Sequence, residues 1–191
     1  MQPIPYAILG VMLATAAPGQ EQNALNYLNQ TREGLIVSVK DLTTAQWNFK
    51  PAPDRWSIAE VVEHLAVTEE GIESLVDHIP QAPAPAAGRD AAKVDAMVLA
   101  KMPDRSTKAR APQQLQPTGR WTPAVALEHF NAACDQLAAD LRHTPDLRRH
   151  VIEHPAFGPL DGYEWILAAA GHAARHTEQI LEVKADPHFP R

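Results

Sequence analysis

Histidines are the residues of this chain whose number and spacing could support chemistry, because nine of them occur in 191 residues. His172 and His176 are four residues apart, so on a helix their side chains lie one above the other on the same face. His64 lies midway along an earlier helical pattern, at the edge of its apolar stripe. Three neutral imidazoles with one open position are the ligand set of a catalytic divalent metal, most often zinc. We predict that these three histidines form a metal site.

The same spacing occurs a second time, in His150 and His154. No apolar stripe surrounds this pair, and Pro155 biases His154 away from helical geometry. We expect a loop or a short hairpin there, with solvated side chains. A surface position is also expected for the remaining four histidines, which are His78, His129, His143 and His188.

Other catalytic groups are not evident in the sequence. It contains no GxSxG motif, and its single cysteine, Cys134, has no activating partner nearby in the sequence. One cysteine also excludes an intrachain disulfide framework and any CxxC motif. Glu60 is better explained as a helix cap, and Glu178 lies about 200° around the helix from His176. The catalytic residues other than metal ligands are therefore left open.

Two further kinds of side chain are expected to have ordinary roles. Arg175 faces away from the two histidines of its helix, as a surface charge or an anion contact. The tryptophans are expected to pack in the core and at helix starts, and they are Trp47, Trp56, Trp121 and Trp165.

Four amphipathic helices are predicted to position the histidines, because apolar residues recur at helical spacing in four segments. Three of these helices begin at capping signals, which are Ser57 with Glu60, Thr122 with Pro123, and Asp161 with Glu164. The helices are expected to run roughly from Glu21 to Leu42, from Ser57 to Ile79, from Thr122 to Leu141 and from Asp161 to Lys184.

These patterns predict an all-α fold, a four-helix bundle with one long proline-rich crossover. The crossover runs from Pro80 to about Thr122, and its prolines forbid a long continuous helix. Only Asp90 to Met102 could form a short helix within it. A segment of this length inside one domain is typical of a lid, a binding loop or a mobile segment.

The N-terminus has two interpretations. An apolar run from Tyr6 to Ala17 is too short to span a bilayer, which needs roughly 20 residues. Ala14-Thr15-Ala16 fits a secretory cleavage site, although no Lys or Arg precedes Arg32. We expect residues 1–19 to be either the signal peptide of an exported protein or the N-terminal arm of a cytoplasmic one. The bundle domain is expected at 20–184, with a C-terminal tail at 185–191.

The amino-acid composition and the net charge limit the kinds of partner that the protein can bind. The chain is 45% hydrophobic, which provides for a core and excludes a disordered or fibrous protein. The net charge of −6, without any basic block, argues against binding to nucleic-acid phosphates. We expect a small-molecule substrate, no nucleic acid and no integral membrane span, and leave a homodimer open.

Two sequence blocks contain the three histidines, WSIAEVVEHL from Trp56 to Leu65 and HAARHTEQI from His172 to Ile180. The first combines a tryptophan, a serine cap and a histidine eight residues after the tryptophan. Together with the turn from Phe157 to Leu160, these blocks resemble the DinB/YfiT-like superfamily of metal-binding four-helix bundles. The resemblance covers about Gln20 to Lys184. It implies Zn²⁺ or Ni²⁺ first, and Mn²⁺ or Fe²⁺ second, on His64, His172 and His176.

The resemblance implies two activities. The superfamily includes metal-dependent hydrolases and thiol S-transferases that use low-molecular-weight thiols such as bacillithiol or mycothiol. A three-histidine metal suits both, because it lowers the pKa of bound water to around 7 and deprotonates a coordinated thiol. A relative in ergothioneine biosynthesis has a similar HxxxHxE string and a further catalytic domain, for which this chain is too short, so sulfoxide synthase activity is not expected.

Two non-catalytic alternatives stay open beside a metal-dependent hydrolase or thiol transferase. One is a binding or stress-response module in which the metal is structural or absent. The other is a helical interaction protein with buried histidines. Metal content distinguishes the last from the others, and an open coordination position with a lined pocket distinguishes an enzyme from a module.

Overall fold

The computed structural model describes residues 18–106, 110–144 and 146–191. The expected signal peptide or arm therefore lies almost wholly outside the described residues, and the division of the chain at residues 19 and 184 stays a prediction. The elements are α1 (Pro18–Ser38), α2 (Thr44–Asn48), α3 (Ile58–Asp77), η1 (Ile79–Gln81), α4 (Ala91–Lys101), η2 (Gln113–Leu115), α5 (Pro123–His143), β1 (Val151–His154), β2 (Gly158–Asp161) and α6 (Gly162–Lys184), where η denotes a short 3₁₀ helix.

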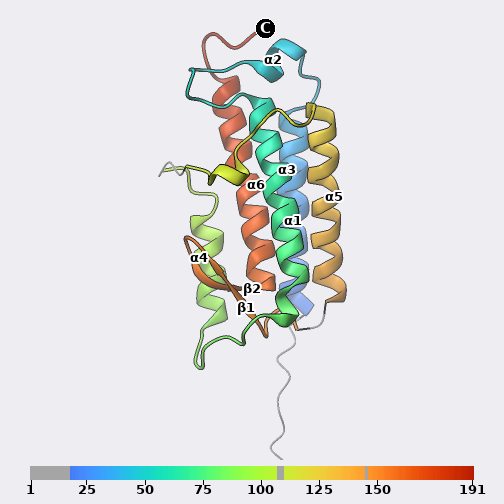
Figure 1. The fold of residues 1–191 in the computed structure, drawn as a ribbon, viewed down its shortest axis with the longest axis vertical. Helices are drawn as coiled ribbons and strands as arrows, with labels where there is room; N and C mark the ends of the chain where they lie inside the picture. Colours follow the sequence, from blue (N-terminus) through green and yellow to red (C-terminus); the bar gives the residue numbers. More distant parts are fainter. Residues whose placement is uncertain (1–17, 107–109, 145) are drawn as a thin grey trace, which may run out of the picture.

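Four long helices form the body of the molecule (Figure 1). α1 and α6 run upward in that view and α3 and α5 run downward. α1 packs against α6 and α5, and α3 packs against the same two helices, so each helix has two main neighbours. The predicted all-α four-helix bundle is confirmed. No helix among the described residues is long and apolar enough to cross a membrane.

The helix starts follow from the capping residues. Ser57 accepts a hydrogen bond from the Glu60 N–H, and Glu60 accepts one from the Ser57 N–H, which completes a capping box. Asp161 and Glu164 form the same arrangement at the start of α6, and Thr122 caps α5. These side chains occupy backbone groups that the first helical turn leaves unpaired. Side-chain chemistry thus fixes where His64 and the two later histidines lie along their helices.

Two of the helices end earlier than the sequence predicts. α1 ends at Ser38 and not at Leu42, because the chain turns and Asp41 adopts a positive φ of 57°. α3 ends at Asp77, and Ile79 lies in η1, since a residue before proline is biased away from helical geometry. Ile79 is buried nevertheless, as its place in the apolar stripe predicts.

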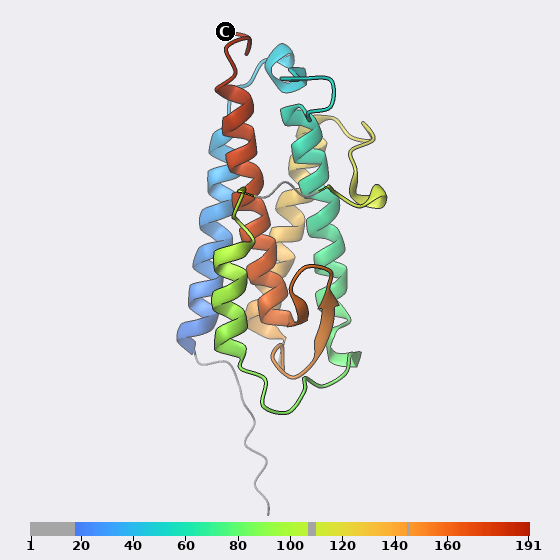
Figure 2. The ribbon, with the colours of Figure 1, turned by 90° about the vertical axis from the view of Figure 1, so that its left-hand side faces the viewer.

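The crossover contains the short helix that the sequence allows. α4 begins after its cap Asp90 and packs along α6, outside the four-helix body (Figure 2). The two helices approach closely at Gly171, where a Cβ atom would lie 2.9 Å from the Cβ and Cγ atoms of Met102. A side chain at this position would therefore push α4 away from the histidine-bearing part of α6. The short helix α2, with a capping box at Thr43 and Gln46, was not expected.

A β-hairpin precedes α6, as expected around His150 and His154. β1 and β2 pair antiparallel, with Val151 opposite Asp161 and His154 opposite Gly158. Gly158 has a φ of +74°, a conformation that glycine adopts without the cost a Cβ atom imposes. The expectation of solvated histidines was wrong, because both rings are half-buried.

An ionic network joins α4, the hairpin and the start of α6. The Arg148 guanidinium donates to both carboxylate oxygens of Asp95 on α4, at 2.8 Å each, and to Asp161 at 3.2 Å. Arg89, which precedes α4, contacts Asp161 and Glu164. The carboxylates of Asp161 and Glu164 are fully buried, so these arginines supply the compensating charge that burial demands.

Candidate metal centre

His64, His172 and His176 meet between α3 and α6, as their positions on the two helices predict. One ring nitrogen of each lies within 4.8 Å of those of the other two. The His64 Nε2 and His172 Nε2 atoms are 3.2 Å apart. Two nitrogens bonded to one tetrahedral zinc ion at about 2.0–2.1 Å lie roughly 3.3 Å apart. This trio is the one group of three or more such side chains that could hold a metal ion among the residues with described placement.

The three rings are held by their other nitrogen. Nδ1 of His64 lies 2.8 Å from the Leu115 carbonyl oxygen in η2. Nδ1 of His172 lies 3.1 Å from Oε1 of Glu69, and Nδ1 of His176 lies 2.8 Å from Oε1 of Gln179. The carbonyl oxygen of Leu115 and the amide oxygen of Gln179 are acceptors, so the Nδ1 atoms of His64 and His176 carry the hydrogen as donors, and the ionised form of Glu69 accepts from His172 in the same way. Each Nε2 then keeps its lone pair for a ligand.

The same environment keeps the rings uncharged. Burial, followed by the neighbouring charge of His172, lowers the pKa of His64 to about 4. Burial and the charge of Arg175 lower the pKa of His172 to about 4. Burial and the other two histidines hold the pKa of His176 well below its usual value. Neutral imidazole is the form that binds a metal, so the ligands are ready at neutral pH.

Glu69 is a functional side chain that sequence reasoning missed. Its carboxylate is 1% exposed, and Oε2 has no hydrogen-bond partner among the described atoms. Burial raises its pKa well above the ordinary value. A signal was present, because Glu69 interrupts the apolar stripe of α3 between Leu65 and Ile72. A lone carboxylate at a core position needs a partner, and that partner is His172.

The crossover and the segment before α3 complete the surroundings of the histidines. Trp56 was expected only to pack at a helix start, yet its ring lies 4.9 Å from that of His64 and 6.5 Å from that of His176. Arg105 donates to Gln179, the residue that holds His176. Segments far apart in the sequence therefore orient the same three rings.

The other residues that the sequence analysis considered for a catalytic role are exposed, buried or engaged in other contacts. Glu60 caps α3 and pairs with Lys50 at 2.9 Å, and Glu178 is exposed. Cys134 is buried, and burial raises the pKa of its thiol. Arg175 donates to the Asp104 carbonyl oxygen, while its charge still reaches His172.

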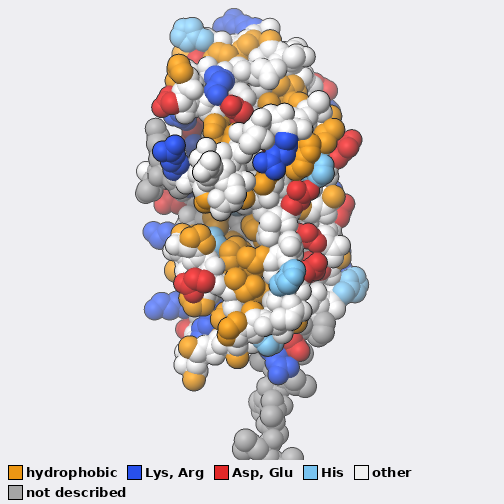
Figure 3. All heavy atoms as spheres, viewed as in Figure 1, with side chains coloured by type: hydrophobic (Ala, Val, Ile, Leu, Met, Phe, Trp, Pro, Cys, Tyr) orange, Lys and Arg blue, Asp and Glu red, His pale blue; other side chains and the backbone are white. Residues whose placement is uncertain are grey.

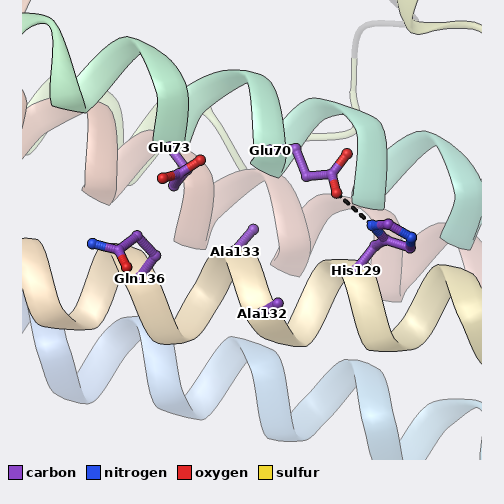
Figure 4. A pocket seen from close by; sticks show the side chains of 6 residues that line it. All are labelled: Glu70, Glu73, His129, Ala132, Ala133 and Gln136. Atoms are coloured by element: carbon purple, nitrogen blue, oxygen red, sulfur yellow. Dashed lines mark hydrogen bonds and ion pairs between the residues drawn. The ribbon is translucent and has the colours of Figure 1, made fainter.

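A separate hollow of about 230 Å³ lies between α3 and α5 and contains none of the three histidines. Figure 4 shows Glu70 and Glu73 projecting from α3 toward His129 and Gln136 of α5. His129 pairs with Glu70 at 2.5 Å and stacks on Trp121, with ring centroids 4.0 Å apart. His129 is half-buried, but 38% of its side chain is exposed, so it lies at the surface as expected, and His78, His143 and His188 are exposed as expected too.

Comparison with known proteins places this geometry in a family. A curated relative, the uncharacterized protein YuaE of Bacillus subtilis strain 168, is 26% identical over 164 residues, which cover 84% of this chain and 96% of that protein. The solved structure of YfiT from Bacillus subtilis matches with a TM-score of 0.60 and 17% identity, over 90% of this chain and 89% of that one. YfiT is described as a probable metal-dependent hydrolase with an unusual four-helix bundle topology.

The family comparison covers most of the chain. The family model of the DinB superfamily matches residues 27–180, a range that contains all three histidines and both sequence blocks that carry them. The resemblance stated from those two blocks is thereby confirmed, and the chain belongs to the DinB superfamily.

Proposed function

We propose that this protein is a metal-dependent hydrolase of a small molecule, with a divalent ion held by His64, His172 and His176. The observation that carries the proposal is the shared orientation of the three rings. Each Nδ1 is engaged by an acceptor of the protein, so the three Nε2 atoms are the nitrogens left for a common ligand. The description of the structural neighbour YfiT agrees with this function.

The donor set fits a borderline divalent metal. Three imidazoles suit zinc, nickel and iron better than magnesium or calcium, which prefer oxygen ligands. We propose zinc or nickel first, and manganese or iron second. The buried carboxylate of Glu69 on His172 adds the outer partner that metal-bound histidines commonly have.

Three protein ligands leave a tetrahedral ion one open position, at which a bound ion would activate water for attack on a substrate. The protein residues keep the three histidine rings fixed in orientation and uncharged, as this step requires. The acceptors at the three Nδ1 atoms fix the rings, and the rings stay neutral because burial keeps their pKa values low. His172, whose side chain is 13% exposed, is the ring that solvent reaches most easily.

Thiol transfer is the second candidate, because a metal ion on the same three histidines would also deprotonate a coordinated thiol. The only thiol of the chain is Cys134, which is buried and has a raised pKa, so the protein offers no nucleophilic sulfur of its own. A low-molecular-weight thiol would then be a co-substrate that occupies the same open position. A binding module without catalysis is the alternative outside enzymes.

Two assays on the zinc- and nickel-loaded protein separate these functions. The first measures hydrolysis of a panel of small esters and amides, and the second measures conjugation of an electrophilic dye to an added thiol. We expect turnover in the first assay that requires metal and is lost in His176→Ala but kept in His143→Ala. Turnover only with added thiol would favour the transferase. Metal-loaded protein without turnover in either assay would contradict the proposed catalysis.

A further inference from the structure

The hairpin brings a group of aromatic rings to the start of α6. The His154 ring stacks on Phe157, with centroids 4.7 Å apart and an angle of 26° between the planes. It also lies 4.9 Å from the ring of Trp165. Figure 2 shows the hairpin beside the start of α6, next to α3. We call His154, Phe157 and Trp165 the aromatic wall.

The aromatic wall lies on the same face of α6 as the candidate metal centre. Trp165 precedes His172 by seven residues, which is nearly two helical turns and a distance of about 10 Å along the axis. Burial, followed by the positive charge that His172 would carry when protonated, lowers the pKa of His154. Figure 3 shows hydrophobic side chains gathered in a vertical band between α4 and α3 on this side of the molecule.

The wall offers uncharged ring surface. Two of the three ring nitrogens of the wall are turned to the backbone, since His154 Nδ1 accepts from the Ala156 N–H at 3.1 Å and Trp165 Nε1 donates to the Ile152 carbonyl at 3.3 Å. Trp165 is buried against the His154 ring, and His154 and Phe157 are half-buried. A surface of this kind binds an apolar or aromatic group better than a charged one.

The geometry points to a substrate class: we infer that the aromatic wall binds an uncharged aromatic arm of the small molecule whose reacting group binds at His64, His172 and His176. This inference rests on the proposed function. It assigns His154 and Phe157 a role in selecting the substrate by an arm that extends from the metal position toward the start of α6.

The first test uses metal-free protein and benzyl alcohol as the probe. We expect NMR titration to shift the Trp165 indole N–H and the backbone N–H signals of Ala156 and Phe157, and to leave the Trp121 indole unchanged. Benzyl alcohol that shifts none of the wall signals would overturn the inference, whatever the protein does with metals.

The second test uses cobalt-loaded protein and phenylalkyl hydroxamates of increasing arm length. The visible spectrum of cobalt reports hydroxamate binding. We expect affinity to rise roughly tenfold over acetohydroxamate once the phenyl ring can reach the wall, and less for alkyl arms of equal length. Equal affinity for acetohydroxamate and for the longest phenylalkyl probe would contradict the inference.

Variants separate binding from structural support. His154→Ala and Phe157→Ala should each remove most of the preference for the long phenylalkyl probe and leave acetohydroxamate affinity unchanged. His150→Ala, a histidine in the same hairpin region that is not part of the wall, should change neither. Equal weakening of both probes by His154→Ala and Phe157→Ala would mean that these residues only support the fold, and the inference would be wrong.

The two tests also distinguish this inference from the proposed function. If cobalt binds but acetohydroxamate leaves its spectrum unchanged, the open position of the proposed function is refuted. The benzyl alcohol titration then still decides whether the aromatic wall binds a ring.

Discussion

Among single residues, the buried carboxylate of Glu69 orients one of the three rings of the candidate metal centre, that of His172. It accepts from His172 Nδ1 at 3.1 Å, and its own side chain is only 1% exposed. Sequence reasoning looked for such a carboxylate beside His64 and His176 on their own helices. Glu69 lies five residues after His64 and reaches the histidine of the other helix, a contact that only the packing of α3 on α6 creates.

Removal of this partner should weaken metal binding without removing a ligand. We expect Glu69→Ala to lower zinc affinity roughly 10- to 100-fold, because His172 loses the acceptor that fixes its ring. Glu69→Gln should lose less, since its amide oxygen can still accept from Nδ1. Competition titration against a chelator measures both, and Glu70→Ala is the matched control because Glu70 pairs with His129. Unchanged affinity in Glu69→Ala would show that His172 needs no support.

Among the elements, the crossover is hydrogen-bonded to α3 next to His64. The buried Glu63 carboxylate accepts from the Thr118 N–H at 2.7 Å and from the Gly119 N–H at 2.9 Å. Burial alone would raise the pKa of Glu63, but the backbone donors outweigh it and the pKa is lowered. The same stretch carries Leu115, which holds His64, so the proline-rich segment takes part in building the site.

Substitution of Glu63 should therefore destabilise the protein in a pH-dependent way. We expect Glu63→Gln to lower the free energy of unfolding by about 2 kcal/mol at pH 7, since an amide NH₂ would face a backbone donor. The unfolded carboxyl titrates near 4.5 and the folded one below that value, so the unfolded chain binds more protons between them. The stability that Glu63 contributes is thus full above that window and lost as the pH falls through it.

Urea denaturation of wild type and Glu63→Gln at pH 7 and pH 3.5 tests this. The difference between the two proteins should shrink at the lower pH. Glu128→Gln, an exposed glutamate of α5, should match the wild type throughout. If the difference in free energy of unfolding between the two proteins were the same at both pH values, the ionised Glu63 carboxylate would not be what holds the crossover on α3.

At the scale of the whole molecule, the four-helix body could be predicted from sequence and the parts attached to it could not. Apolar stripes and capping residues are local signals, and they placed three helix starts correctly. The site required long-range contacts, such as Leu115 on His64 and Arg105 on Gln179, which leave no periodic pattern. The hairpin could be anticipated from Pro155, but not the burial of His154 against Trp165.

Arg148 links α4 and the hairpin to the start of α6, and its substitution should lower the free energy of unfolding. Its side chain is 11% exposed and lies 3.8 Å over the Tyr163 ring, between Asp95 and Asp161. We expect Arg148→Met to lower the free energy of unfolding by about 3 kcal/mol, because buried carboxylates lose their counter-charge. Arg149→Met, which breaks only the exposed pair with Asp146, should stay within about 0.5 kcal/mol of wild type. Thermal or urea denaturation compares the two, and equal effects would contradict a structural role for the network.

We propose that three histidines from two helices bind one metal ion. Elemental analysis after loading with zinc or nickel and desalting tests it most directly, on wild type, His64→Ala and the control His129→Ala. We expect close to one ion per chain in wild type and in His129→Ala, and almost none in His64→Ala with its helix content retained. Equal metal in wild type and His64→Ala, or none in wild type with either metal, would contradict it.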